Sequence, residues 1–265
     1  MRKGSPRSYT LIWMYIGLVI LFIYLPLAPP LLFSVTSTVD GAGSFTLSWY
    51  GEIWRNPVLT RAIITSLEVG FIVAIASTVL GLAASMAIRE LKVPRLILAL
   101  VLLPLFIPGI SAGLATALFF REAGISPSLL TIAIVQITWA LPFTTLVILI
   151  AMTTFDPVYL EAAAMNGANR LRGFLDIELP LIRSGVLGAA TFSLILSFNE
   201  TIRTSIVQGG NNTVQTYIWA TYQQIGLSPT LYALMSLLII MTFVLIVAFL
   251  VGTRGGGGPV SHRGE

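Results

Sequence analysis

The sequence predicts an all-α membrane protein with six transmembrane helices. Hydrophobic residues form 56% of the chain and charged residues only 10%, whereas about a quarter of the residues in a soluble domain are charged. The mean hydropathy is +0.90. The apolar residues gather in long segments, and roughly 20 apolar residues in a helix are enough to cross a bilayer. The six segments run near residues 11–32, 63–88, 96–118, 129–152, 184–198 and 231–251.

Each segment carries its own signals. The first follows MRKGSPR, but it is too long for a signal peptide and lacks a small-x-small cleavage site, so we expect an uncleaved helix. The third contains Pro104 and Pro108, and the fourth contains Pro142. Such breaks free backbone groups that neighbouring helices or a cavity must satisfy. Small residues recur every four positions at Ser77, Gly81 and Ser85, and again at Gly109 and Gly113. For these we favour close helix packing over direct contact with a solute.

The composition excludes several classes of function. The net charge is only +4 and the basic residues are spread over short loops, which argues against nucleic-acid binding. There is no cysteine, and the one histidine, His262, lies in a Gly-rich tail, so neither a metal site nor a catalytic triad is expected. A nucleotide-binding G-x-x-x-x-G-K-S/T loop is also missing, because the glycine run 255–258 is followed by Pro259. We therefore expect no enzyme and no cofactor in this chain.

The distribution of lysine and arginine predicts the orientation, since cytoplasmic loops are enriched in both. One set of polar segments holds eleven of the fifteen: Arg2, Lys3, Arg7, Arg89, Lys92, Arg95, Arg170, Arg172, Arg183, Arg254 and Arg263. The other set holds four: Arg55, Arg61, Arg121 and Arg203. Both termini and the loop at 153–183 are therefore predicted to be cytoplasmic.

That cytoplasmic loop is predicted to form two short helices. Asp156 and Pro157 are a good helix start, because Asp caps free N–H groups and Pro fits the first turn. A helix over 158–166 would end at Gly167 in a left-handed conformation. A second helix over 169–176 would place Leu171, Phe174 and Leu175 on one face. Pro180 is expected to break the chain before the fifth span.

The same loop carries a motif. It reads E-A-A, three residues, Gly, nine residues, I-x-L-P, and its residues are Glu161, Ala162, Ala163, Gly167, Ile177, Leu179 and Pro180. A lone E-A-A would suit an ordinary amphipathic loop on the membrane surface. The full spacing resembles the signature of permease subunits of bacterial ABC importers. The resemblance implies that the loop docks into a separate ATPase, and the small Ala162 and Ala163 would let that surface approach closely.

The resemblance extends over nearly the whole chain. FTLSWYGEIW at 45–54, TSLEVG at 65–70 and FSLILSFNE at 192–200 resemble the spermidine and putrescine permease subgroup. This implies a MetI-like permease domain over 11–252, between a cytoplasmic segment at 1–10 and a flexible tail at 253–265. It also implies a bacterial inner membrane location, a second permease that is either a copy of this chain or a homologous partner, a periplasmic substrate-binding protein, and an ATPase dimer that binds ATP and Mg. Related permeases move ferric iron, opines or other small organic solutes, so those cargoes stay open; a passive channel is the least consistent with the motif.

Two acids in the spans are candidates for the solute path. Glu68 lies roughly 10 Å into the second span, counting 1.5 Å per residue from Arg61. Glu200 ends the fifth span, next to Asn199, in a string where the subgroup commonly has S-F-D/N-D/E. An ionisable group inside a membrane usually faces a path or a partner. These residues therefore either line a passage for a cation or form structural pairs, such as Glu200 with Arg203.

Overall fold

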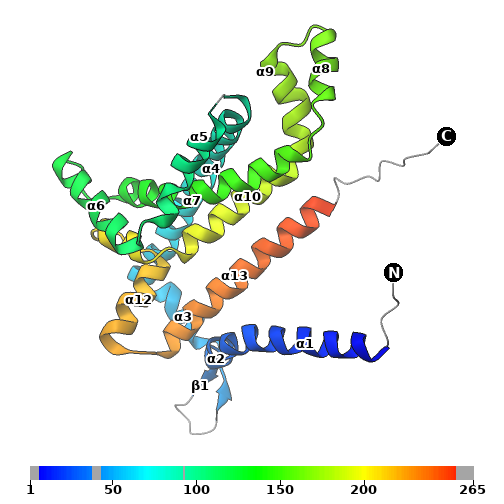
Figure 1. Ribbon diagram of the computed structural model, residues 1–265. Coiled ribbons are helices and arrows are strands. Elements are labelled where there is room, and N and C mark those ends of the chain that lie inside the picture. Colours follow the sequence, from blue (N-terminus) through cyan, green and yellow to red (C-terminus); the bar gives the residue numbers. More distant parts are fainter. Residues whose placement is uncertain (1–5, 38–42, 92, 255–265) are drawn as a thin grey trace.

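The computed structural model describes residues 6–37, 43–91 and 93–254 (Figure 1). Parts of the expected terminal segments 1–10 and 253–265 fall outside these residues, as do His262 and four of the basic residues counted above, Arg2, Lys3, Lys92 and Arg263. The described elements are α1 (Pro6–Tyr24), η1 (Leu25–Leu27), α2 (Ala28–Phe33), β1 (Thr36–Ser37), β2 (Ser44–Phe45), α3 (Ser48–Arg55), α4 (Pro57–Glu90), α5 (Pro94–Leu102), η2 (Leu103–Phe106), α6 (Gly109–Glu122), α7 (Leu129–Thr153), α8 (Val158–Met165), α9 (Arg170–Arg172), η3 (Gly173–Glu178), α10 (Leu179–Asn199), α11 (Ile202–Val207), α12 (Val214–Ile225) and α13 (Pro229–Arg254).

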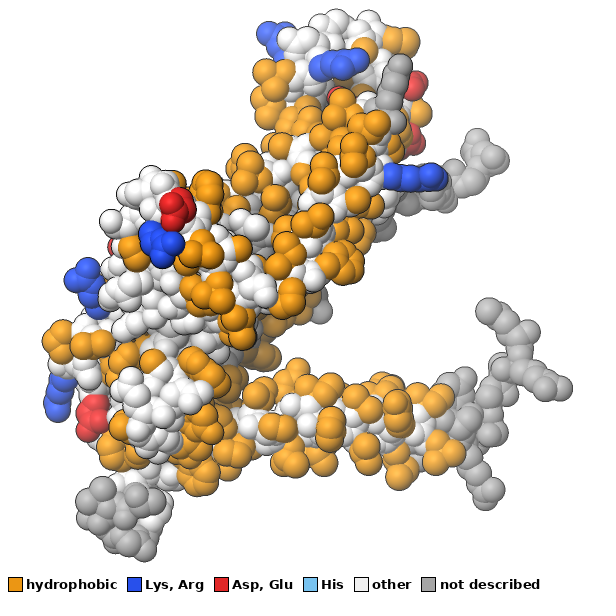
Figure 2. Space-filling view, turned by 60° about the vertical axis from the view of Figure 1, so that its left-hand side comes forward, with side chains coloured by type: hydrophobic (Ala, Val, Ile, Leu, Met, Phe, Trp, Pro, Cys, Tyr) orange, Lys and Arg blue, Asp and Glu red, His pale blue; other side chains and the backbone are white. Residues whose placement is uncertain are grey.

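Most of the expected spans are confirmed. In the described part of the chain, five helical segments are long and apolar enough to cross a membrane: Leu11–Phe33, Pro57–Glu90, Leu129–Thr153, Arg170–Asn199 and Pro229–Gly252. Figure 2 shows hydrophobic side chains over much of the visible surface of these helices, with charged side chains mainly toward the ends. The all-α membrane fold is therefore the one that the apolar segments predict.

The third expected span is not one straight helix. The residues form two helical pieces, Pro94–Phe106 and Gly109–Glu122, which meet at an angle of 102°. The bend falls at Ile107 and Pro108, where the backbone becomes extended. A proline at this point has no N–H to donate and disfavours the α conformation in the residue before it. The break that the prolines predict in the third span is therefore confirmed.

Pro142 has the opposite outcome. Helix α7 runs through it without a break, and the Pro142 side chain is buried. The hydroxyls of Thr144 and Thr145 each donate to the Leu141 carbonyl, at 2.9 and 2.8 Å. Proline has no N–H for the carbonyl four residues earlier, that of Thr138, yet α7 continues, so the break expected at Pro142 is absent.

Helices α4, α7 and α10 pack together and form the centre of the molecule. The small residues of α4 lie in these contacts. Ser77 shares a hydrogen bond of 2.5 Å with Ser193 of α10, and the hydroxyl of Ser85 donates to the Thr145 carbonyl of α7 at 3.0 Å. A Cβ on Gly81 would come within 2.7 Å of the Thr144 hydroxyl. The expectation of close packing at Ser77, Gly81 and Ser85 is confirmed.

The glycines of α6 serve the same purpose. A Cβ on Gly113 would come within 2.7 Å of Ile206 of α11, and one on Gly109 would lie 3.4 Å from the guanidinium carbon of Arg203. The missing side chain of Gly113 therefore lets α11 lie close against α6, whereas a Cβ on Gly109 would make an ordinary contact.

The N-terminal part lies apart from this centre. Figures 1 and 2 both show α1 projecting from the rest of the molecule as a separate rod. Its large apolar side chains are exposed all round, with Trp13 at 70% and Phe22 at 78%. The short segment that follows, α2, and the helix α3 contact α13 instead. A helix apolar on every side fits a lipid environment.

Candidate functional site

The first half of the loop at 153–183 forms as its sequence predicts. The backbone N–H of Val158 donates to the Asp156 carboxylate at 3.0 Å, so Asp156 caps the start of α8. At the other end Gly167 has a φ of +83°. The N–H groups of Gly167 and Ala168 donate to the carbonyls of Ala164 and Ala163, both at 3.0 Å. This is a Schellman ending, and glycine is the residue that adopts its left-handed position without strain.

The second half differs from the prediction. Asn169 caps a new helix by accepting from the Arg172 N–H at 2.9 Å. The helix does not stop at 176, because α9, η3 and α10 join into one helical segment, Arg170–Asn199. Leu171 and Leu175 are exposed, whereas Phe174 is half-buried. The expectation of a separate short helix is therefore wrong.

Pro180 does not break the chain, and η3 supplies the reason. This segment is a π-helix, and the N–H of Leu179 donates to the Phe174 carbonyl five residues earlier. A wider turn leaves room for the proline ring, which in a regular α-helix would clash with the carbonyl four residues before it. The prediction of a break at Pro180 is therefore wrong.

The E-A-A residues lie on the part of the loop that projects from the bundle, where α8 and α9 are drawn at the top of Figure 1. Glu161, Ala162 and Gly167 are exposed and Ala163 is half-buried. Ile177 and Leu179 are half-buried and Pro180 is exposed, on the helix that leads back to the bundle. Around the motif lie exposed apolar side chains: Val158, Tyr159, Met165 and Leu171. An exposed apolar tip on a loop is typical of a surface that binds another protein.

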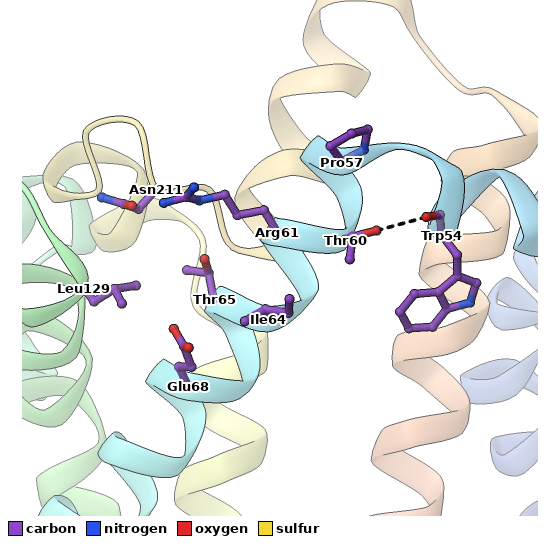
Figure 3. Close-up of a pocket in the computed structure, with 9 residues that line it drawn as sticks. All are labelled: Trp54, Pro57, Thr60, Arg61, Ile64, Thr65, Glu68, Leu129 and Asn211. Carbon is purple, nitrogen blue, oxygen red and sulfur yellow. Dashed lines mark hydrogen bonds between the residues drawn. The ribbon is translucent and has the colours of Figure 1, made fainter.

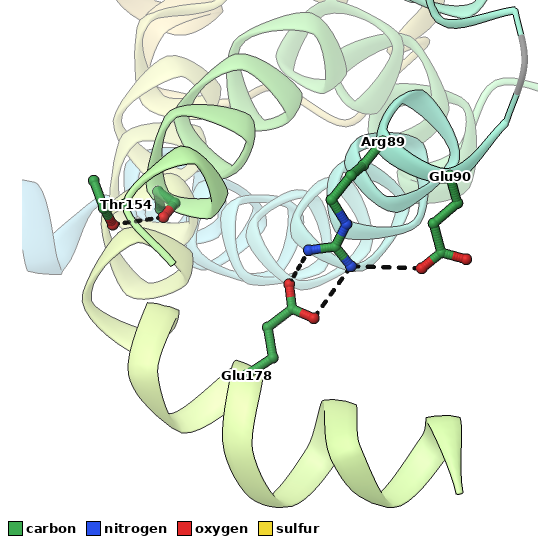
Figure 4. A network of polar contacts seen from close by, with 5 residues as sticks. Arg89, Glu90, Thr154 and Glu178 are labelled. Atoms are coloured by element: carbon green, nitrogen blue, oxygen red, sulfur yellow. Dashed lines mark hydrogen bonds and ion pairs between the residues drawn. The ribbon is translucent and has the colours of Figure 1, made fainter. Parts of the chain in front are cut away.

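An ion pair that the sequence did not reveal ties this loop to the bundle. The two terminal guanidinium nitrogens of Arg89, Nη1 and Nη2, donate to the carboxylate of Glu178 in η3, Nη2 at 3.1 Å (Figure 4). Arg89 lies at the end of α4. The Glu178 side chain is only 1% exposed and the Arg89 side chain 31%. Nη2 of Arg89 also lies 3.5 Å from the carboxylate of Glu90. Glu178 is the x residue of the I-x-L-P string, and the spacing of that string assigns no role to this residue.

The pair lies in the wall of a hollow of about 630 Å³ between α4, α8 and the α9–η3 segment. The lining residues that matter here are Met86 and Arg89 of α4, Leu160 and Ala163 of α8, and Phe174 of η3. The motif residue Ala163 thus faces this hollow, with Glu161 exposed beside it.

A second hollow, of about 620 Å³, lies at the other end of α4 (Figure 3). It is lined by Arg61, Thr65 and Glu68 of α4, together with Trp54 and Asn211. Glu68 is exposed, and in the described part of the chain its carboxylate makes no hydrogen bond or ion pair. Figure 3 shows Arg61 extended toward Asn211, with Glu68 further along the same helix. Both charges therefore face one hollow.

Glu200 and Asn199 lie elsewhere. The Glu200 carboxylate is 5% exposed and accepts from Arg203, from the side-chain Nη1 at 2.9 Å and from the backbone N–H at 2.8 Å. The Arg203 guanidinium also lies 4.0 Å from the ring centre of Trp139. The Asn199 amide donates to the Ile195 carbonyl of its own helix at 2.9 Å. The pairing of Glu200 with Arg203 is thus present. The three residues considered for the solute path, Glu68, Asn199 and Glu200, do not line one common hollow.

A buried polar chain links α7 to α10 and α11. The Gln136 side chain is 1% exposed. Its amide nitrogen donates to the Thr204 hydroxyl at 2.9 Å, and its amide oxygen accepts from Ser197 at 2.5 Å. Sequence reasoning missed this chain, because a single glutamine in an apolar helix has no distinctive spacing.

Comparison with known proteins agrees with this architecture. Residues 77–254 match the family described as binding-protein-dependent transport system inner membrane component. The chain is similar to the spermidine/putrescine transport system permease protein PotC of Shigella flexneri, with 24% identity over 90% of this chain and 94% of that protein. It is similar to the putrescine transport system permease protein PotI of Escherichia coli K12, with 26% identity over 82% of each chain. The trehalose transport system permease protein SugB of Mycobacterium tuberculosis is 33% identical over 62% of each chain.

Solved structures show the same fold. A chain of the inward-facing MetNI methionine ABC transporter superposes with a TM-score of 0.66 and 21% identity, covering 78% of this chain and 99% of that one. A chain of a bacterial alginate ABC transporter gives a TM-score of 0.71 at 12% identity, over 96% and 99%. The expected MetI-like architecture is confirmed.

Proposed function

Since the chain belongs to the family of binding-protein-dependent transport system inner membrane components and is a permease subunit of an ABC importer, we propose that it carries an organic cation of the polyamine type. The similarity to PotC and PotI over most of the chain supports this cargo. The observation that carries the proposal is Glu68, a carboxylate without a partner in the described residues, at a hollow large enough for a small solute. An acid in a membrane helix lowers the cost of bringing a cation out of water, which is several kcal/mol for an unpaired charge.

The loop around α8 is the surface on which the ATPase acts when it moves. Its exposed Glu161 and the apolar residues beside it fit a groove on an ATPase subunit. In this mechanism, ATP binding closes an ATPase dimer, which draws together the loop of this chain and that of a second, homologous permease. The closure opens the path toward a periplasmic binding protein, and hydrolysis returns it toward the cytoplasm. ATP and Mg stay on the ATPase, and this chain supplies no catalytic group.

The orientation can be tested by cysteine labelling, because the chain has no cysteine of its own. Met165 is 86% exposed and helical, so it accepts a cysteine better than Gly167 with its positive φ. Met165→Cys should resist an impermeant reagent in intact cells and react after permeabilisation. Ser126→Cys, in the exposed loop between α6 and α7, is the matched control and should react from outside. Labelling of Met165→Cys in intact cells would show that this loop is periplasmic.

The coupling role is tested by Gly167→Pro and Glu161→Lys. Proline cannot adopt the φ of Gly167 and cannot donate to the Ala164 carbonyl, and Glu161→Lys reverses the charge of the docking helix. Both variants should insert normally yet lose transport and copurifying ATPase. Wild-type transport in both would show that another surface couples to ATP.

One observation favours a second cargo. Arg61 faces the same hollow as Glu68, so a solute with both a carboxylate and an amine, as in an opine, also fits the charges. Uptake into vesicles that hold the complete complex separates the two. Inhibition by excess putrescine or spermidine, and not by an amino-acid-like zwitterion, supports the polyamine cargo; the reverse pattern supports the second. Under the second cargo Arg61→Gln should slow uptake, whereas a pure cation should gain from losing Arg61.

A further inference from the structure

The coupling loop touches the bundle through a short chain of contacts. Helix α8 packs on η3, where a Cβ on Gly173 would lie 3.2 Å from Leu160. Gly173 is buried, so the two segments are close because this position has no side chain. A displacement of α8 is therefore transmitted to η3 by direct contact.

Segment η3 is in turn fixed to α4 by the Arg89–Glu178 pair. Both carboxylate oxygens of Glu178 are held by the two terminal nitrogens of one guanidinium. Such a fork constrains direction as well as distance. The carboxylate is almost fully buried, and a buried charge without its partner is strongly unfavourable. The pair is therefore a stiff joint between two elements 89 residues apart in sequence.

Helix α4 connects this joint to the solute hollow. Arg89 and Glu68 lie on the same unbroken helix, about 30 Å apart at 1.5 Å per residue. In its middle α4 is held to α7 and α10 through Ser85 and Ser77. The helix that presents Glu68 to the hollow is thus the one that Glu178 holds from the cytoplasmic end.

We propose that Glu178 and Arg89 are positioning residues of the transport cycle, and that their ion pair makes α4 follow the coupling segment when the ATPase moves it. This inference rests on the proposed function, because it concerns how the loop's motion reaches the solute path. The π-helical turn that carries Glu178 fits this role, since π turns are frequent at functional sites and locally re-aim a side chain. In the described residues, Glu178 is the one acid of the motif segment that is buried.

The experiment uses spin labels on the full chain, reconstituted in lipid nanodiscs with the second permease, the ATPase dimer and the binding protein. Leu91→Cys and Asp176→Cys place labels on exposed residues, one beyond the end of α4 and one in η3. With the native pair intact, the distance between the labels should be the same in the nucleotide-free and ATP-trapped states. A change of several ångströms between the two states would overturn the inference without any mutation in the pair.

The second arm removes the charge with Glu178→Gln. In the nanodiscs the label distances should spread. In sealed vesicles that hold the complete complex, the amount of solute moved per ATP hydrolysed should fall about fivefold or more, the lower end of typical coupling between sites. Glu122→Gln is the matched control, because Glu122 pairs with Arg121 at 3.1 Å but both side chains are more than 70% exposed; it should change neither quantity. Unchanged distances and unchanged transport per ATP in Glu178→Gln would reject the proposed joint.

These outcomes are separate from a failure of the proposed function. An unmodified chain that recruits no ATPase and takes up no solute would contradict the function. The label distances in Glu178→Gln would still decide whether the ion pair holds α4 and η3 together.

Discussion

Two arginine–glutamate pairs with a buried carboxylate occur in the described residues, and they differ in what they join. Glu200 and Arg203 are three residues apart, at the corner between α10 and α11. Arg89 and Glu178 are brought together from separate elements only when the chain has folded. Burial differs as well, since Arg203 is 11% exposed and Arg89 31%.

The two pairs use the same arginine–carboxylate contact in different ways. A local pair neutralises a turn inside an apolar region and can do so in any state of the bundle. A pair between distant elements also fixes their relative position, so it can transmit a movement of one to the other. Loss of either pair should therefore have a different consequence from a change at a position that has no pair.

The largest effect is expected for the local pair. Glu200→Ala leaves the Arg203 guanidinium buried with no carboxylate, which typically costs about 3–5 kcal/mol. The ring of Trp139 offsets only about 0.5–2 kcal/mol of this. Thermal unfolding in detergent should therefore shift strongly, and the amount of folded protein should fall. Glu122→Ala, which removes an exposed partner, is the control, and equal stability of the two variants would contradict this account.

The Arg89–Glu178 pair should respond asymmetrically. Arg89→Ala leaves the Glu178 carboxylate in a site that is 1% exposed, whereas Glu178→Ala leaves Arg89 near water and Glu90. We expect a loss of up to about 3 kcal/mol for Arg89→Ala and about 1 kcal/mol for Glu178→Ala. Unfolding of both variants under one condition measures the difference. A larger loss in Glu178→Ala would mean that Arg89 is less solvated than its exposure indicates.

Local signals in the sequence predicted the first half of the loop correctly. Asp156, Pro157 and Gly167 determine where α8 begins and ends, because caps and left-handed glycine act within a few residues. The apolar segments also predicted the spans, since the bilayer sets their length. These features depend on near neighbours or on the solvent, and both can be inferred from the order of residues.

The features that could not be predicted depend on contacts between distant residues. Pro180 is tolerated because η3 adopts a π turn, and nothing in the local string requires that turn. The Arg89–Glu178 pair needs α4 and η3 to meet. The third span bends at Pro108 while α7 passes through Pro142 unbroken. Proline therefore marks a place where a helix is weakened, and packing decides whether it bends.

A smaller effect is expected at Gly81, where α4 packs closely against α7 and no ion pair is involved. Gly81→Ala would place a Cβ 3.1 Å from the backbone nitrogen of Thr145 as well as against the Thr144 side chain, and such overpacking costs about 1–3 kcal/mol. Gly51→Ala in α3 meets nothing within 4 Å and should stabilise its helix by about 0.5–1 kcal/mol. Opposite signs in thermal unfolding would show that the α4–α7 contact, and not the loss of glycine as such, limits this position. Equal shifts of the unfolding temperature in the two variants would contradict a limit set by the α4–α7 contact.

The smallest effect on stability is expected at Glu68, an acid with no partner in the described residues. Glu68→Gln removes a charge from an exposed side chain, so the free energy of unfolding should change by less than about 0.5 kcal/mol. Uptake of a cationic solute should nevertheless slow severalfold, because the charge that offsets the solute's own is gone. Glu122→Gln, on an exposed residue outside the hollow, should change neither quantity.

Folded protein and initial uptake rate, measured on the same preparation, separate the two roles considered for Glu68. A fall in folded protein would reveal a structural partner, such as a residue of the second permease. Normal folding with normal uptake would remove Glu68 from the path, and the cation proposal would lose the observation that carries it.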